Sequence, residues 1–480
     1  MNRTLIRSQD LSWTRTDLED QINIIANVFS ERQHANSPIG LLADNSPEWI
    51  AADLAAQSVA PIVPIPLFFT PEQMVHTIKT SGLGSLLTSN SIFAEHIGFT
   101  FSGHSFGHLH LFHAAHYDHS IEAAYHGVDK VTFTSGTTSN PKGVCLSSIA
   151  QWQVAETLAN ALAPLKIKKH LNLLPFAVLL ENLAGVYASL LSDAENICLP
   201  MDQVGFEGSS QFNPNQCLSA IEEYQAESVI LLPQMLQAIT SVLHQNDPRI
   251  ASLKFVAVGG AKTPTSLITK ALDLGLPVFE GYGLSECSSV VALNLPENRK
   301  VDSVGRPLAN RQVRIAEDGE IQVSGQAPVH YFGQAIQASE WLDTGDIGHL
   351  DEDGYLYIDG RKKNILVTGF GRNVSPEWPE TLLMETGLIK QVMVVGDGKS
   401  YLSALIVPIS ELISNAQIDA LISEVNLKLP DYACIQGWVR VDEAFSPSNN
   451  MTTPNGRLKR EAILSQYQNE IESLYEIQGS

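Results

Sequence analysis

The sequence predicts an α/β protein whose large N-terminal portion is built on parallel sheets. The first observation is a β-α-β unit, in which Ile39–Leu42 and Pro61–Pro66 read as buried strands and a helix starting at Pro47 lies between them. Glu227–Pro233 and Phe255–Ala261 read as further buried strands. The second of these runs into a glycine turn, the place where open α/β sheets bind ligands. The chain has 480 residues, and because a domain has about 150, more than one is expected.

Apolar spacing and capping residues predict the other elements. In chain order they are a helix over Leu18–Phe29, a helix start with Ser46 as cap, a helix over Ile149–Leu162, a strand over Leu171–Pro175, an apolar helix over Val178–Leu191 with one charge at Glu181, a strand over Ile365–Thr368, and a capped helix start at Ser375-Pro376-Glu377.

Composition excludes several classes of protein. The chain has 30 basic and 52 acidic residues, a net charge of −22, which argues against nucleic acid or an anionic membrane as a partner. Five scattered cysteines without a C-x-x-C pair suit a reducing compartment. No run of 18 apolar residues occurs, and the stretch from Met1 to Trp13 lacks the apolar core of a signal peptide. We therefore expect a cytoplasmic protein with no integral membrane segment.

Eight of the fourteen histidines lie between His96 and His126. His108 and His110 would share one face of a strand, as metal ligands do. No cysteine occurs in this stretch, and the spacing of the histidines becomes irregular. Both observations favour a variable surface stretch over a metal site.

A loop of small hydroxyl residues and glycines follows the short strand Val131–Phe133. It reads Thr134-Ser135-Gly136-Thr137-Thr138-Ser139-Asn140-Pro141-Lys142-Gly143. Small residues let backbone N–H groups converge on an anion, and Lys142 supplies a positive charge. This is not a Walker A loop, because Pro141 precedes the lysine and Gly143 follows it. The loop predicts phosphate binding, and the alternative is a Ser/Thr/Gly-rich surface loop.

Two later motifs fit a nucleotide. The first reads Glu280-Gly281-Tyr282-Gly283-Leu284-Ser285-Glu286. Its glycines permit close approach of a flat ligand, Tyr282 offers a ring for stacking, and Glu286 is a hard oxygen ligand suited to Mg²⁺. By itself it could also be a tight turn. The second is Thr344-Gly345-Asp346, whose carboxylate can accept ribose hydroxyls.

In this order, the motifs resemble those of the adenylate-forming superfamily, and especially its AMP-binding acyl-CoA synthetases. The family's phosphate loop has glycine where this chain has Ser139. The resemblance implies that Tyr282 stacks on adenine, Ser285 contacts the α-phosphate and Glu286 holds Mg²⁺. It further implies that the nucleotide site includes Thr134, Ser135, Gly136, Thr137, Thr138, Gly260, Ala261, Glu280, Gly281, Gly283 and Asp346.

The resemblance extends to the C-terminus. Arg361 matches the family's ribose- and phosphate-facing arginine, and Lys363 matches the hinge of a mobile lid. The domains implied are an ATP- and acid-binding domain over residues 1–361 and an α+β lid over 362–480. Near the end, Arg457 stands where the family has a catalytic lysine, and Lys459 follows two residues later. Either Arg457 or Lys459 serves adenylation, or this step is impaired, since arginine and lysine are not interchangeable.

The implied activity is that of an acid–thiol ligase. ATP activates a carboxylic acid to an acyl-adenylate, and the acyl group then passes to a thiol, that of coenzyme A, with release of AMP and pyrophosphate. Val178 replaces a histidine frequent in the family, and with the apolar helix after it this favours a fatty or aryl acid. The alternatives are a ligase that loads the phosphopantetheine of an acyl or peptidyl carrier protein, a luciferase-like oxygenase, and a non-catalytic homologue that binds a nucleotide or acyl ligand.

Overall fold

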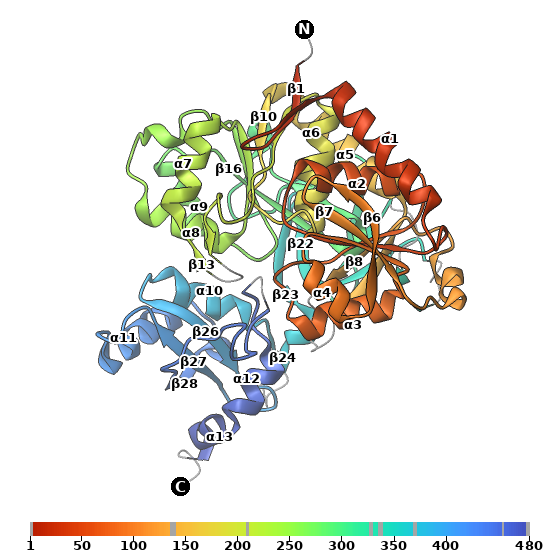
Figure 1. Cartoon of the computed structure of the whole chain (residues 1–480). Coiled ribbons are helices and arrows are strands. Elements are labelled where there is room, and N and C mark those ends of the chain that lie inside the picture. Colours follow the sequence, from red (N-terminus) through yellow and green to blue (C-terminus); the bar gives the residue numbers. More distant parts are fainter. Residues whose placement is uncertain are drawn as a thin grey trace.

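The computed structural model describes residues 3–134, 141–207, 211–325, 330–334, 339–367, 372–453 and 456–476. An N-terminal body carries two large sheets and a smaller one, and the C-terminal portion lies against one end of it (Figure 1).

The first large sheet contains the predicted β-α-β unit. Its strand order is β21-β9-β8-β4-β3-β5-β7-β6. These strands are β21 (His330–Tyr331), β9 (Lys142–Leu146), β8 (Lys130–Thr134), β4 (Ile62–Pro64), β3 (Ile39–Leu42), β5 (Ser85–Thr88), β7 (Leu109–Ala114) and β6 (Phe99–Phe106). β3 pairs in parallel with β4 and β5, and β4 with β8, which confirms the predicted parallel arrangement.

The second large sheet has the order β18-β17-β16-β15-β14-β10-β11-β1-β2. Its strands are β18 (Arg306–Pro307), β17 (Ser289–Leu293), β16 (Val278–Leu284), β15 (Phe255–Val258), β14 (Ser228–Leu231), β10 (Lys169–Leu171), β11 (Glu195–Ile197), β1 (Thr4–Arg7) and β2 (Ser12–Thr14). β14, β15 and β16 run parallel, so their carboxyl ends share one edge. In doubly wound sheets that edge is where ligands bind.

Helices cover the sheets and separate them. They are α1 (Arg15–Glu31), α2 (Pro47–Ala56), α3 (Pro71–Ser81), α4 (Ser91–His96), α5 (Ser148–Leu162), α6 (Ala188–Leu191), α7 (Pro214–Tyr224), α8 (Pro233–Val242) and α9 (Thr265–Asp273). α5 lies between the two large sheets, because its Ala155 packs in one core with Leu41 of β3 while its Val154 packs in another with Phe255 of β15. α7, α8 and α9 cover the far face of the second sheet (Figure 1).

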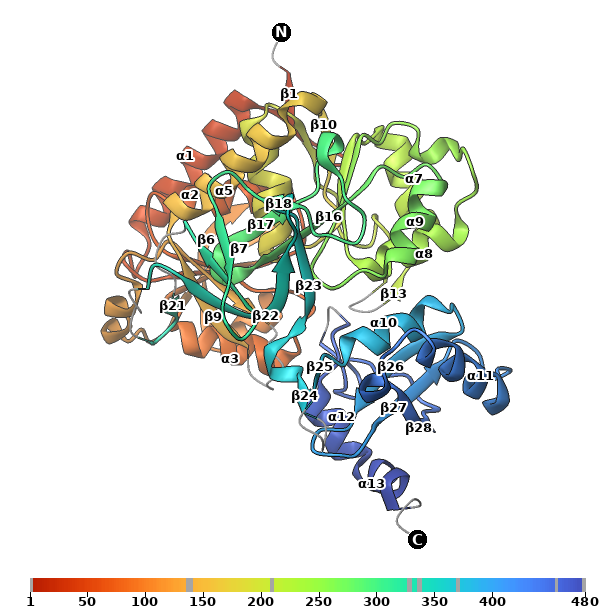
Figure 2. The ribbon, with the colours of Figure 1, turned by 180° about the vertical axis from the view of Figure 1, so that it is seen from behind.

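A four-stranded sheet leads to the C-terminal portion. It comprises β19 (Gln312–Ile315), β20 (Glu320–Ser324), β22 (Leu342–Leu350) and β23 (Leu356–Arg361). From behind, β22 and β23 are seen to extend towards β24 (Leu366–Val367), which pairs with β25 (Asn373–Val374) (Figure 2). A short hairpin, β12 (Phe206–Glu207) with β13 (Gln211–Phe212), lies at the edge of the body.

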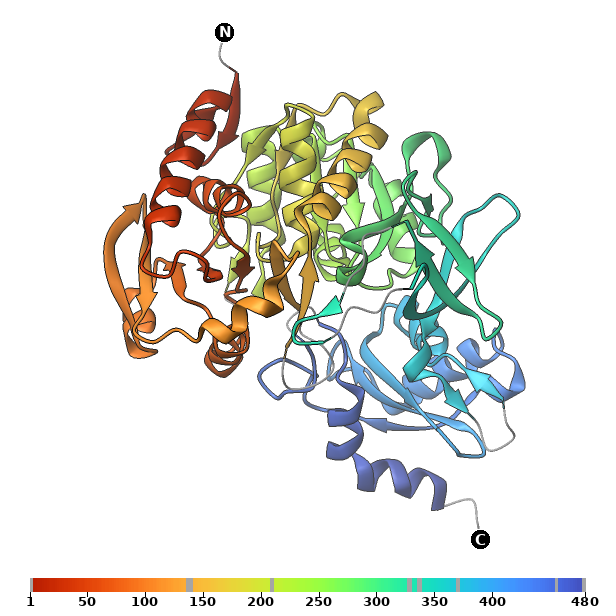
Figure 3. The same ribbon diagram turned by 90° about the vertical axis from the view of Figure 1, so that its right-hand side faces the viewer.

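The C-terminal portion has a core on each face of a small sheet of β26 (Ile389–Val395), β27 (Leu402–Pro408) and β28 (Ile435–Arg440). Its helices are α10 (Glu377–Glu385), α11 (Asn415–Asn426), α12 (Arg460–Gln466) and α13 (Gln468–Glu476). Figure 3 shows this portion beneath the N-terminal body. The arrangement confirms the predicted class, a large α/β portion followed by a smaller α+β one.

Three predicted elements differ from the structure. The strand expected at Leu171–Pro175 ends at Leu171, because side chains then take over the backbone hydrogen bonds: Asn45 Nδ2 donates to the Leu174 carbonyl. The helix expected over Val178–Leu191 contains a π-helical turn, η3 (Glu181–Tyr187). Ser375 does not cap α10; its hydroxyl donates instead to the Glu377 carboxylate at 2.7 Å.

The histidine-rich stretch forms β6, β7 and the turns beside them. Among the described residues, no group of three or more His, Cys, Asp or Glu side chains is arranged to hold a metal ion. In the same ranges, no helix is long and apolar enough to cross a bilayer.

Candidate active site

One cavity collects nearly all of the predicted site residues that the structure describes. It has a volume of about 1950 Å³ and lies at the carboxyl ends of β14, β15 and β16, between the N-terminal body and the C-terminal portion. Its lining includes Thr134, Lys142, Gly260, Ala261, Glu280, Gly281, Tyr282, Gly283, Ser285, Glu286, Asp346, Arg361, Lys363 and Arg457. Lys459 is absent from this lining. Ser135, Gly136, Thr137 and Thr138 lie outside the described residues.

The predicted phosphate loop begins and ends on two paired strands. Thr134 ends β8 and Lys142 opens β9, and the two residues face each other in the antiparallel register. The hairpin therefore brings the two ends of the loop together at the cavity. The side chain of Lys142 is exposed, and its Nζ lies 5.8 Å from the centre of the Tyr331 ring.

The second motif is a strand followed by a tight turn, because residues 285–288 join β16 to its antiparallel partner β17. Glu280 to Leu284 belong to β16, and Ser285 begins the 3₁₀ turn η5 (Ser285–Cys287), which carries Glu286. Gly283 is required for packing, because a Cβ there would lie 1.8 Å from the Ser289 carbonyl oxygen of the neighbouring strand. All five residues of the motif that belong to the strand line the cavity.

Asp346 is the centre of a buried hydrogen-bonded group. Its Oδ2 accepts a hydrogen bond of 2.6 Å from Tyr282 Oη, and its Oδ1 lies 2.8 Å from Arg361 Nε. The pairing of β22 with β23 sets Asp346 directly opposite Arg361. Burial raises the pKa of Asp346, and the Arg361 charge opposes that shift. A carboxylate has about four lone-pair sites, so this one keeps acceptor capacity for a ligand.

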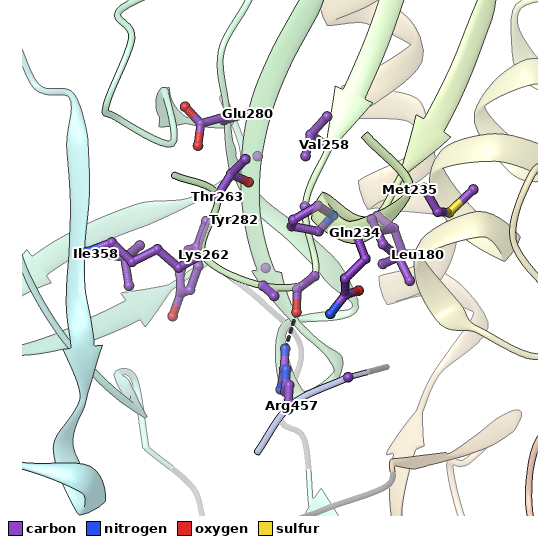
Figure 4. A pocket seen from close by; sticks show the side chains of 18 of the residues that line it. Leu180, Gln234, Met235, Val258, Lys262, Thr263, Glu280, Tyr282, Ile358 and Arg457 are labelled. Atoms are coloured by element: carbon purple, nitrogen blue, oxygen red, sulfur yellow. Dashed lines mark hydrogen bonds between the residues drawn. The ribbon is translucent and has the colours of Figure 1, made fainter. Parts of the chain in front are cut away.

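Glu280 is a buried acid with an unused oxygen. The residue is 9% exposed, and its Oε2 has no hydrogen-bond partner in the part of the chain that the structure describes. Burial, with a smaller contribution from Asp302, raises the pKa of Glu280 to about 8. Figure 4 shows it in the pocket wall with Thr263, Tyr282 and Ile358. A buried acceptor without a donor is costly, and a ligand N–H would relieve it.

Glu286 is suited to hold a divalent cation. Its Oε1 accepts a hydrogen bond of 2.6 Å from Tyr331 Oη, which leaves Oε2 free to bind a metal. Mg²⁺ is commonly held by one or two carboxylates together with substrate phosphates. A single carboxylate in the cavity that Lys142 also lines fits that pattern.

Arg457 reaches the N-terminal body and Lys459 does not. The Arg457 guanidinium donates from Nη2 to the carbonyl of Gly260 (Figure 4). Arg457 is exposed, but partial desolvation beside the N-terminal body lowers its pKa, as does the Arg361 charge, whereas the Asp346 and Glu286 charges raise it. Lys459 instead donates to Asn450 within the C-terminal portion. The turn before Arg457 needs glycine, since Gly456 has a φ of 76° and a Cβ there would lie 2.2 Å from Gln234 Nε2.

The segment predicted to be a hinge lies at the join of the two portions. Lys363 is exposed in the 3₁₀ turn Lys362–Asn364, which follows β23. Beside it, Lys362 Nζ lies 2.6 Å from both Asp318 Oδ2 and Glu320 Oε2 of the N-terminal body. Farther along, Asn364 Nδ2 donates to Glu377 Oε1 at 2.6 Å.

An apolar extension of the cavity runs between the central helices and the second sheet. Leu180, Ala184 and Ala188 recur at a spacing of four and so share one face of the helical segment. Opposite them, Phe255 and Ala257 lie on the same face of β15.

The one charged residue of the 178–191 segment, Glu181, is paired with a histidine. Glu181 is fully buried, and its Oε1 lies 2.9 Å from His170 Nε2. The π-helical turn also brings Gly185 close to this pair, since a Cβ there would lie 2.1 Å from Glu181 Oε1. π-helical turns occur frequently at functional sites.

Sequence reasoning missed two residues of the site. Tyr331 contacts Lys142 and Glu286, and Ile358 lines the cavity. Neither belongs to a motif whose chemistry could be read from the sequence, and only the pairing of strands brings them to the others.

Sequence models of one protein family match most of the chain. The model described as "AMP-binding enzyme" matches residues 1–328, and "AMP-binding enzyme C-terminal domain" matches residues 363–479.

Curated relatives are CoA ligases. The long-chain-fatty-acid–CoA ligase FadD15 of Mycobacterium bovis is 33% identical over 246 residues, which cover 45% of this chain and 41% of that protein. The chain thus spans less than half the length of this relative. The 2-succinylbenzoate–CoA ligase of Bacillus pumilus is 25% identical over 426 residues, which cover 82% of each protein.

Solved structures share the fold. The anthranilate CoA ligase AuaEII, in complex with anthranoyl-AMP, superimposes with a TM-score of 0.79 at 18% identity, covering 98% of this chain and 95% of that one. The o-succinylbenzoate CoA synthetase MenE of Bacillus subtilis, with ATP and magnesium, gives 0.77 at 21% identity and covers 96% of each chain. Together with the family models, which span both portions of the sequence, these similarities mean that the chain belongs to the AMP-binding enzyme family.

Proposed function

We propose that this protein activates a carboxylic acid with ATP to an acyl-adenylate and then transfers the acyl group to the thiol of coenzyme A. The observation that carries the proposal is the convergence of Lys142, Glu286 and Arg457 on the cavity that holds the Asp346–Tyr282–Arg361 group. The names of the curated relatives, which act on fatty, succinylbenzoic and indoleacetic acids, support the same chemistry.

The nucleotide is proposed to bind along β16. Tyr282 stacks on the adenine from one side and Ile358 contacts it from the other. Glu280 Oε2 accepts a hydrogen bond from the exocyclic amine of adenine, which supplies the missing donor. Asp346 accepts the ribose hydroxyls, and Arg361 holds Asp346 in place at 2.8 Å.

In the first half-reaction a carboxylate oxygen of the acid attacks the α-phosphorus, the bond to the bridging oxygen breaks, and pyrophosphate leaves. Lys142, Ser285 and Arg457 orient the phosphates and bind the charge that builds up on them. Mg²⁺, held by Glu286, supplies charge neutralisation at the phosphates when it is bound. Arg457 is proposed for this step rather than Lys459, because only Arg457 lines the cavity.

In the second half-reaction the thiolate attacks the acyl carbon and AMP leaves. We propose that residues 1–361 form the binding domain and residues 362–480 a lid that turns at Lys363. Rotation would withdraw Arg457 from Gly260 and open a path for the thiol.

The substrate is proposed to be an acid with an extended apolar tail. Four residues of β15 and its turn line the cavity, namely Phe255, Ala257, Val258 and Gly259, so the lining follows the strand over four steps. Four steps of a strand span about 13 Å, so the extension is deep enough for an aliphatic chain rather than a small acid alone.

The test is acid-dependent exchange of labelled pyrophosphate into ATP, with acids of two to sixteen carbons and with aryl acids. We expect exchange with medium- and long-chain acids. Ala188→Phe, which fills the extension beside Phe255, should abolish exchange with long acids and preserve it with short ones. Free coenzyme A and a phosphopantetheinylated carrier protein are then compared as acceptors of the adenylate. Absence of exchange with every acid, despite ATP binding, would refute the proposal.

A further inference from the structure

Tyr331 connects the two charged ends of the proposed phosphate site. It lies in β21, which pairs with β9, and it stands opposite Val144 in the antiparallel register. The next residue continues the link, as Phe332 N donates to the Gly143 carbonyl at 2.8 Å. The backbone of Tyr331 is therefore fixed to the strand that begins with Lys142.

The side chain of Tyr331 contacts both an acid and a base. Its hydroxyl donates to Glu286 Oε1 at 2.6 Å, and its ring centre lies 5.8 Å from Lys142 Nζ. The hydroxyl is the donor in this bond, because an ionised carboxylate only accepts hydrogen bonds.

This geometry fixes which oxygen of Glu286 is presented to a ligand. With Oε1 held by the tyrosine, Oε2 is directed away from that bond. No ion pair within the described ranges joins Lys142 to Glu286, although both line the same cavity. The aromatic ring is a neighbour of both side chains and keeps the cation available for phosphate and the carboxylate available for metal.

We propose that Tyr331 is a positioning residue that orients Glu286 towards the divalent cation and Lys142 towards the phosphates. The inference rests on the proposed function, because it takes Glu286 to be the metal ligand of that site. Hydrogen-bonding partners of metal ligands commonly affect metal affinity by about 10- to 100-fold when removed.

The decisive variant is Tyr331→Phe, which removes the donor and keeps the ring. Mn²⁺ serves as the probe, and its binding in the presence of a non-hydrolysable ATP analogue is followed by electron paramagnetic resonance. We expect the Kd for Mn²⁺ to rise about tenfold. In pyrophosphate exchange, the Mg²⁺ concentration for half-maximal rate should rise in parallel, with a much smaller change in the rate at saturating Mg²⁺.

Tyr357→Phe is the matched control. Its hydroxyl also donates to a carboxylate, Asp351 Oδ2 at 3.2 Å, but it does not line the cavity. It should leave Mn²⁺ affinity unchanged. A second variant, Tyr331→Leu, removes the ring as well and should also weaken binding of the ATP analogue without metal, because Lys142 loses its neighbour.

The outcomes separate this inference from the proposed function. Unchanged Mn²⁺ affinity in Tyr331→Phe overturns the positioning role even if the wild type catalyses exchange. Weakened Mn²⁺ binding supports the role even if no acid sustains exchange, in which case only the proposed reaction is wrong. A uniform loss of rate in Tyr331→Phe, with an unaltered Mg²⁺ requirement, would indicate a structural role and also overturn the inference.

Discussion

Replacing Glu280 with glutamine should abolish a pH dependence of adenine recognition. The carboxyl has a pKa of about 8, against an ordinary value of 4.5, so about half is ionised at pH 8, about a tenth at pH 7 and about a hundredth at pH 6. If the adenine amine donates to the ionised form, apparent affinity scales with that fraction. Adenosine affinity should then rise about fifty-fold from pH 6 to pH 8 and level off above it.

The raised pKa of Glu280 also makes the stability of the fold depend on pH. Because the folded state raises the pKa of Glu280, it favours the protonated form. This contribution to stability is complete below pH 4.5 and is lost as the pH rises through about 8. Ligand binding to the ionised form offsets that loss, so thermal stabilisation by adenosine should be larger at pH 8.5 than at pH 6.

Isothermal titration calorimetry with adenosine, which has no phosphate to titrate, measures the effect between pH 6 and 9. Glu280→Gln keeps a carbonyl acceptor but cannot ionise, so its affinity should be flat over this range. Inosine, which lacks the amine, is the ligand control. A flat profile in the wild type, or a slope that persists in Glu280→Gln, would refute the reasoning. An affinity that falls with pH would mean that the protonated carboxyl donates to the base.

Three other predictions concern single side chains. Arg457→Ala should reduce pyrophosphate exchange by about 100-fold or more, as loss of one oxyanion donor does, whereas Lys459→Ala should retain most of it; the reverse ranking would assign the role to Lys459. Glu286→Gln should raise the Mg²⁺ requirement for exchange, and unchanged turnover would remove Glu286 from the metal site. Lys130→Met should destabilise the fold by about 3–5 kcal/mol in urea titrations. The reason is that Asp53, which lies 2.8 Å from Lys130 Nζ and is 1% exposed, would be left as a buried unpaired charge. The double variant Lys130→Met with Asp53→Asn should recover most of that loss.

Much of the fold was predictable because local chemistry decides it. Ser46 caps α2 through its hydroxyl, and Pro47 occupies the first turn, as the residue types indicate. Periodicity likewise placed α5 within one residue of its observed start. The π-helical turn was not predictable, because its cause is a contact: Glu181 turns inward to His170, which comes from a strand.

The candidate site was likewise predictable in part. Motifs located Tyr282, Asp346 and Arg361, but the hydrogen bond of Tyr282 to Asp346 joins residues 64 apart in sequence. Tyr331 lies 45 residues from Glu286, and only the pairing of β21 with β9 places it there. Residue type signals what a side chain can do, and the topology of the sheets decides which side chains meet.

The choice between Arg457 and Lys459 shows how a short turn decides chemistry. Their side chains are two residues apart, and both carry a positive charge. Gly456 turns with a φ of 76°, a conformation that favours glycine, and Arg457 after it reaches the Gly260 carbonyl. A guanidinium has five donors in a fixed fork, so it can keep that bond and still offer N–H groups to a phosphate. An ammonium at the same position would have fewer donors and no fixed plane. The contact also links the C-terminal portion to the loop after β15. The proposed rotation about Lys363 would therefore break it, so that Arg457 would be present for adenylation and absent for thiol transfer.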